Sequence, residues 1–161
     1  MSKIIIYANE NGGVSLCIPS GEITIDEVLS KDCPAGAIIV EEKVLKGKDY
    51  DFFDAWELNG NEIIVSMQKA REIWKQKLAI EAEAKIEELN KLYHVYIDEG
   101  KDPAPVIEKR KMLRNITNDK AIASAKTVED LKTFWPEVLT APVGYPLAIV
   151  LVAVQKTDQR T

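Results

Sequence analysis

The hydrophobic pattern of this chain changes its period near residue 66, and that change constrains the fold more than any other feature. Before it, short apolar runs are separated by turns rich in glycine, proline and asparagine, which is typical of strands. After it, apolar side chains recur every three or four residues over about thirty residues, as along one stripe of a helix. The pattern predicts an α+β protein with a β-rich module at 1–66 and a helical module at 67–140.

The first module contains sequence signals for a small sheet and one short helix. Thr24 stands three residues before Glu27, the spacing of a capping box, so a helix is expected at roughly residues 25–31. This helix is expected to pack on the sheet. The expected strands are Ile4–Tyr7, Val14–Ile18, Ala37–Val40 and Ile63–Val65.

The segment NENGGVSLCIP, at residues 9–19, raises the question of a phosphate-binding loop. The glycines of such a loop must lead into a helix N-terminus, so that free amide groups point at the anion. Here Gly12 and Gly13 lead into the extended run Val14–Ile18 instead. Asn-Gly is a favoured dipeptide in tight two-residue hairpin turns. The segment therefore predicts a hairpin turn at Asn11 and Gly12.

The second module reads as a helical hairpin with short closing helices. A long helix is expected from Met67 to about Asp98, with Gly100 ending it, and a second helix begins at Pro103. Shorter helices are expected at Lys120–Ala125 and from Thr127 to Pro136. The stripe of the long helix consists of Met67, Trp74, Leu78, Ala82, Ile86, Leu89, Tyr93 and Tyr96.

This stripe is longer than a second helix of about fourteen residues can cover. Two explanations remain open for the part of the stripe that the second helix cannot cover. It is buried by the β-rich module, or it is an interface with a partner or a second copy of the chain.

The third segment, residues 141–161, contains eight unbroken apolar residues at Leu147–Val154. That length is far below the roughly twenty residues of a membrane-spanning helix. Its β-branched content favours a strand buried on both faces. An unpaired strand of this kind would promote aggregation, so it is expected to complete the chain's own sheet or to pair with another protein.

Charge and cysteine content limit the classes of partner. The formal net charge is −5, which gives no general attraction to nucleic acid or to an anionic membrane. Two cysteines are too few for a disulfide framework, and the first residues do not resemble a signal peptide. The sequence predicts a protein of the reducing cytoplasm that binds neither nucleic acid nor membrane.

Residues with catalytic chemistry are few. His94 is the only histidine, and it lies inside the expected long helix, so neither a zinc site nor a nucleophile beside its base is predicted. Neither Cys17 nor Cys33 stands in a nucleophile motif. We expect no catalytic residue, no metal and no cofactor.

An acidic group at Asp49, Asp51 and Asp54 allows two interpretations. One is an acid/base pair or a site for a divalent cation. The other, which we favour, is a solvated loop attached to the core by its aromatic residues, Tyr50, Phe53 and Trp56.

Several stretches of the sequence follow one another in a recognisable order. They include Ile5-Ile6-Tyr7, Asn11-Gly12-Gly13-Val14-Ser15, Lys31-Asp32-Cys33-Pro34-Ala35-Gly36, Phe53-Asp54-Ala55-Trp56, Lys111-Met112-Leu113-Arg114-Asn115-Ile116-Thr117 and Trp135-Pro136-Glu137-Val138-Leu139. This order resembles a family of small bacteriophage and prophage proteins encoded near tail and tail-fibre genes, the tail or tail-fibre assembly chaperone-like proteins. The resemblance covers roughly residues 4–139, and the segment from Ala141 onward lies outside it.

The resemblance implies a non-enzymatic protein that contacts a phage tail or tail-fibre protein in the bacterial host cytoplasm during assembly. Alternatives are a permanent, oligomeric virion component, such as a connector, adaptor or decoration protein, and an inhibitor of a host enzyme or defence system whose acidic group imitates nucleic acid. Large aromatic and aliphatic side chains suit such contacts. The expected partner-binding residues are Trp74, Leu78, Tyr93, Tyr96, Leu147, Ile149 and Leu151.

Overall fold

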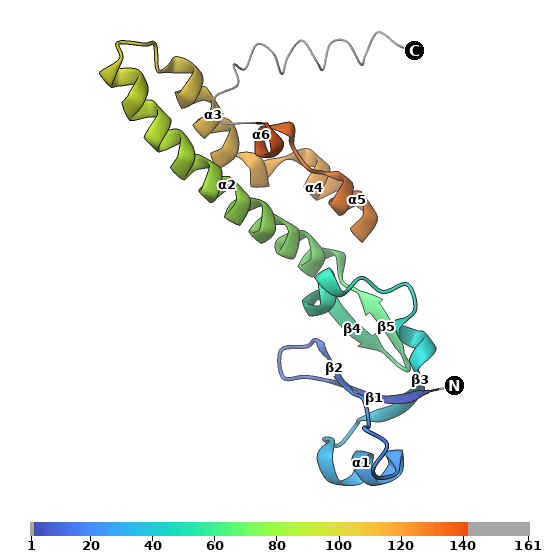
Figure 1. The fold of residues 1–161 in the computed structure, drawn as a ribbon. Helices are drawn as coiled ribbons and strands as arrows, with labels where there is room; N and C mark the ends of the chain where they lie inside the picture. Colours follow the sequence, from blue (N-terminus) through green and yellow to red (C-terminus); the bar gives the residue numbers. More distant parts are fainter. Residues whose placement is uncertain (1, 142–161) are drawn as a thin grey trace. The chain divides into compact units, whose positions relative to one another are not determined.

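The structure is a computed structural model, and it describes residues 2–141 of the chain. The α+β class predicted from the sequence is confirmed, with small sheets before the helices (Figure 1). The chain divides into two compact units. The first runs to Ile73 and includes Lys126–Val128; the second begins at Trp74 and resumes at Glu129. The division therefore falls inside the long helix, several residues after the change of period at residue 66.

A three-stranded antiparallel sheet organises the first unit. The central strand β1 (Lys3–Ala8) pairs with β2 (Val14–Cys17) on one side and with β3 (Ile38–Glu41) on the other. Successive side chains of a strand point to opposite faces. Ile4 and Ile6 accordingly pack in a core cluster with Val14 and Val40. Ile5, fully buried and outside that cluster, lies on the other face.

The predicted hairpin between β1 and β2 is confirmed, with a longer turn than expected. Asn9 N–H donates to Gly13 O, and Gly12 N–H donates to Asn9 O, both at 3.0 Å. Gly12 has a φ of +73°, the left-handed conformation that closes three-residue hairpin loops. Asn9 Oδ1 also accepts from the Asn11 and Gly13 amides. The loop amides are therefore used within the hairpin.

Helix α1 (Ile25–Asp32) forms as the capping box predicts. Glu27 N–H donates to Thr24 Oγ1, while Thr24 N–H donates to the Glu27 carboxylate. The helix contacts β1 and β3 and contributes the buried Val28. Figure 1 shows α1 on one side of the three-stranded sheet and a second hairpin on the other.

That second hairpin pairs β4 (Trp56–Asn59) with β5 (Glu62–Val65), and only β5 was expected from the sequence. Two 3-10 helices precede it, η1 (Glu42–Leu45) and η2 (Tyr50–Ala55). Trp56 is fully buried in the core cluster, as predicted. Tyr50 is 59% exposed, but its ring contacts that of Trp56, with 5.1 Å between the ring centroids, as the predicted attachment through the aromatic residues requires. Phe52, which was not expected in the core, is also fully buried.

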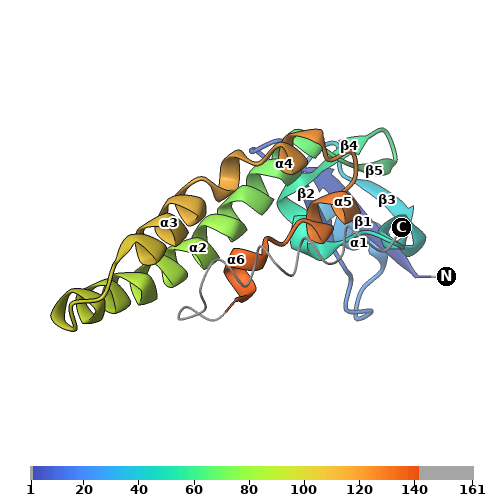
Figure 2. The ribbon, with the colours of Figure 1, turned by 90° about the horizontal axis from the view of Figure 1, so that it is seen from above.

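The second unit is built on α2 (Met67–Asp98), whose predicted bounds are confirmed. Gly100 follows with a φ of +67°, and α3 (Ala104–Arg114) then runs back alongside α2 (Figures 1 and 2). Shorter helices follow: η3 (Ile116–Asn118), α4 (Lys120–Ser124), α5 (Val128–Thr133) and α6 (Glu137–Thr140). The α6 helix was not expected, since Pro136 was interpreted as the end of the last helix.

The core of this unit is formed by one face of α2 and by one or two apolar residues from each later helix. Trp74, Leu78, Ala82 and Leu89 supply the α2 face. Since the short helices bury few residues each, their positions depend on this face. Their buried side chains are Val106, Leu113, Ile116, Ile122, Leu131 and Leu139.

Candidate functional site

The first two residues expected to contact a partner, Trp74 and Leu78, are buried. Trp74 is 4% exposed and Leu78 is fully covered. Trp74 Nε1 donates to the Phe134 carbonyl at 3.2 Å, and its ring lies edge-on to Trp135, with 5.9 Å between the ring centroids. The expectation that these two side chains are exposed was wrong. Phe134 and Trp135 contact Trp74, and Leu78 lies within the core of the second unit.

The last two turns of α2 differ, because cover over the stripe decreases there. Leu89 is buried, Tyr93 and Tyr96 are half-buried, and Ile97 is 50% exposed. Positions 93, 96 and 97 are three and four residues apart, so they lie on one helix face. We call Tyr93, Tyr96 and Ile97 the terminal patch. The expected residues Leu147, Ile149 and Leu151 lie outside the described residues.

Cations hold the two tyrosines of the terminal patch. The Arg110 guanidinium of α3 lies 4.8 Å from the Tyr93 ring centroid, and Arg110 Nη1 donates to Asn90 Oδ1 at 2.8 Å. Lys101 Nζ lies 5.8 Å from the Tyr96 ring centroid. Such cation–π contacts restrict the rings without covering their outer edges. The patch thus presents partly ordered aromatic surface beside an exposed aliphatic side chain.

The acidic group of the first unit does not converge on one point. Asp49 caps η2, accepting from the Asp51 amide at 3.0 Å. Asp54 lines a separate hollow, together with Lys69 and the β1–β2 loop. Within residues 2–141, no group of three or more His, Cys, Asp or Glu side chains is placed to hold a metal ion.

Among the hollows lined by described residues, two lie on the first unit. One, of about 360 Å³, is lined by Asn9, Asn11, Gly13, Val14, Phe53, Asp54 and Lys69. The other, of about 410 Å³, is lined by Ser2, Glu42, Lys43, Leu45, Lys46 and Tyr50.

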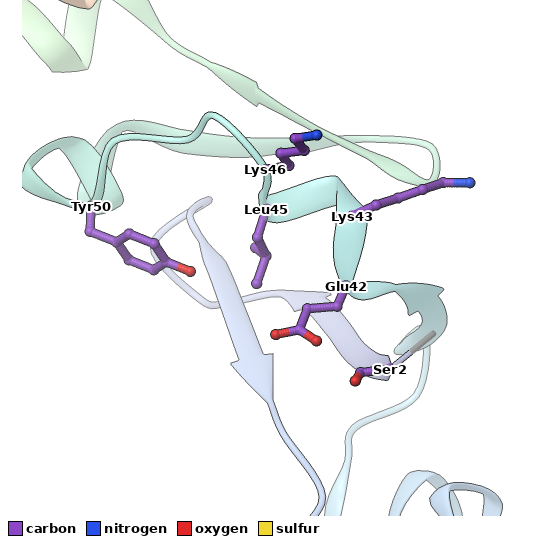
Figure 3. A pocket seen from close by; sticks show the side chains of 6 residues that line it. All are labelled: Ser2, Glu42, Lys43, Leu45, Lys46 and Tyr50. Carbon is purple, nitrogen blue, oxygen red and sulfur yellow. The ribbon is translucent and has the colours of Figure 1, made fainter.

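Neither hollow brings an activated nucleophile to a base. In Figure 3 the Glu42 carboxylate and the Tyr50 ring point toward the same space, and the ammonium groups of the two lysines point away from it. In the first hollow, Lys69 Nζ is already engaged by Glu57 Oε1 at 2.7 Å and by Gly12 O at 3.3 Å. Both hollows are surface depressions, and the Lys69 side chain at the first one is held by contacts within the fold.

His94 and the cysteines belong to different units. His94 is exposed on α2, its ring 5.7 Å from that of Tyr93 between centroids. Cys17 and Cys33 are both half-buried free thiols of the first unit. Burial and the neighbouring Cys17 raise the pKa of the Cys33 thiol, so Cys33 remains protonated at neutral pH. The proximity of these thiols was missed from the sequence, where fifteen residues separate them.

No protein-family model matches the chain, and neither curated proteins nor solved structures show a significant match to it. Over the part of the chain that the structure describes, no helix is both long and apolar enough to cross a bilayer.

Proposed function

We propose that this chain is a non-enzymatic phage protein that acts through protein–protein contacts in the assembly of a tail or tail fibre. The observation that carries the proposal is the terminal patch, where aromatic and aliphatic surface remains uncovered at the end of a long helix. The resemblance over roughly residues 4–139 supplies the phage setting.

The chemistry of the patch suits a protein partner with an apolar groove. An amphipathic helix binds such a groove through side chains spaced three and four residues apart. Tyr93, Tyr96 and Ile97 have that spacing, and tyrosine combines large contact area with few rotatable bonds. The flanking Arg110 and Lys101 would form a polar rim, where carboxylates of the partner would be favoured.

The proposal is tested in a phage whose genome encodes the chain. Replacing Tyr96 and Ile97 together by serine should lower the yield of particles with complete tails, counted by electron microscopy. Ile80→Ser is the matched control, because Ile80 is 71% exposed on α2 away from the patch. Both variants should first be shown to melt as cooperatively as the unchanged protein. Normal tails in the double variant would contradict the proposal.

Mass spectrometry of the purified particles separates two roles within this proposal. An assembly chaperone leaves the finished particle, so its peptides should be absent. Stoichiometric amounts of the chain in the particle would instead identify a permanent virion component.

A further inference from the structure

The sheet of the first unit directs Cys17 toward α1. Cys17 is the last residue of β2 and pairs with Ile5 of β1, which in turn pairs with Ile39 of β3. Directly opposed residues of antiparallel strands point to the same face. Ile5 is fully buried yet outside the core cluster of the opposite face, and α1 contacts β1 and β3. Cys17 therefore faces the layer that contains α1.

Cys33 lies at the end of that same layer. It is the C-cap of α1, directly after Asp32, and its backbone is extended there. After burial, the neighbouring Cys17 is the next cause of the raised pKa of Cys33, which agrees with two thiols close to each other. Both side chains are partly exposed, so a small oxidant can reach them. Strand register and the C-cap position thus place both thiols in the same layer of the first unit.

We propose that Cys17 and Cys33 form a redox-active dithiol, which closes to an intramolecular disulfide when the protein meets a peroxide. The bond would join the end of β2 to the end of α1. This assignment is independent of the proposed function, because it concerns the first unit only.

The reaction balances with hydrogen peroxide as oxidant. The thiolate of one cysteine attacks a peroxide oxygen, the O–O bond breaks, one water forms, and that sulfur becomes a sulfenic acid. The sulfur of the second cysteine attacks the sulfenic sulfur, the S–S bond forms, and the sulfenic oxygen leaves as a second water. Two thiols and one peroxide give one disulfide and two waters. Since the thiolate is the nucleophile, the reaction should be faster at alkaline pH.

The test exposes the purified full chain to hydrogen peroxide and blocks the remaining thiols with N-ethylmaleimide. Intact mass and peptide mapping should show a monomer that has lost two hydrogens, with the Cys17 peptide joined to the Cys33 peptide. Cys17→Ser and Cys33→Ser should not form this species. Wild-type protein that keeps both thiols alkylatable, or that links only as dimers on a non-reducing gel, would overturn the proposal.

A second measurement separates folded geometry from chance encounter in the chain. Proximity in the fold should make disulfide closure about tenfold faster, or more, in native protein than in urea-unfolded protein at the same peroxide concentration and pH. An equal or faster rate in urea would mean that the fold does not bring the thiols together, and the dithiol assignment would be wrong. This comparison uses the unchanged sequence, so it does not depend on the serine variants folding.

Discussion

The indole N–H of Trp74 donates to the backbone carbonyl of Phe134 at 3.2 Å, across sixty residues of sequence. This bond joins the long helix to the segment that follows α5. It also explains why a tryptophan of the apolar stripe is part of the core, because both its ring and its polar atom are engaged within one unit.

Replacing Trp74 by phenylalanine should destabilise the second unit by about 2 kcal/mol, since the Phe134 carbonyl loses its donor and the smaller ring leaves a void. Urea denaturation followed by circular dichroism measures the change. Trp135→Phe is the control, because Trp135 is half-buried and contributes its ring edge to Trp74. We expect a smaller loss there, and equal losses would show that the hydrogen bond adds little.

Lys109 should make stability depend on alkaline pH. Burial lowers the pKa of this lysine below its ordinary value of 10.5, so just below that value the folded state binds fewer protons than the unfolded state. The free energy of unfolding should therefore rise as pH increases through that window.

Lys109→Met should remove this rise, as measured by chemical denaturation at a series of pH values from neutral to about 10. The exposed Lys111→Met serves as the control and should keep it. A slope that is identical in the Lys109 variant and the unchanged protein would contradict the assignment.

The capping box of α1 predicts a local loss of stability. Thr24→Ala should cost about 1 kcal/mol, because the Glu27 amide loses its acceptor, whereas Thr24→Ser keeps an oxygen in place and should cost little. Thermal melts of both variants check this. Equal melting temperatures for the alanine and serine variants would argue against a capping role.

The same box should make stability decrease in acid. Hydrogen bonds from the Thr24 amide, and then from its hydroxyl, lower the pKa of Glu27. The contribution of these bonds is present above the unfolded pKa and is lost as pH falls through the folded one. Glu27→Gln should show a shallower decrease in stability between neutral and acidic pH, measured by denaturation across that range.

Gly12 should be the residue of the β1–β2 loop that tolerates substitution least. Its φ of +73° suits glycine, so Gly12→Ala should cost about 1 kcal/mol or more. Asn11 has no positive φ, and Asn11→Ala should change stability by less than about 0.5 kcal/mol. Denaturation curves of the two variants give the comparison, and a larger loss in the Asn11 variant would refute this account of the turn.

Local signals in the sequence were enough to predict much of the architecture. The capping box at Thr24, Gly100 after the long helix and the short apolar run Ile4–Tyr7 each depend on neighbours in the chain, and each predicted its element. Strand β4 was missed because Trp56 directly follows a 3-10 helix within an aromatic run, where neither strand nor helix period is visible.

The candidate site was less predictable from the sequence, because it depends on which parts of the α2 stripe are buried by later segments of the chain. Trp74 and Tyr96 belong to the same stripe, and their spacing cannot show that one is covered by the segment around Phe134 while the other stays half-exposed. The position of Cys17 on the α1 side of the sheet follows from its pairing with Ile5, and this register cannot be deduced from the composition of the chain.

The position of the boundary inside α2 has a consequence for how such a chain can be recombined. Residues 67–73 of the helix belong to the sheet unit, where Ala70 is buried and Lys69 bonds Glu57 and Gly12. A crossover at residue 66, where the hydrophobic pattern changes its period, would replace those contacts along with the helix. A recombination that preserved the contacts of both units would have to join the helix of one parent to that of the other near Ile73, without a shift in helical register. Related sequences should therefore vary the first two turns of α2 together with the sheet.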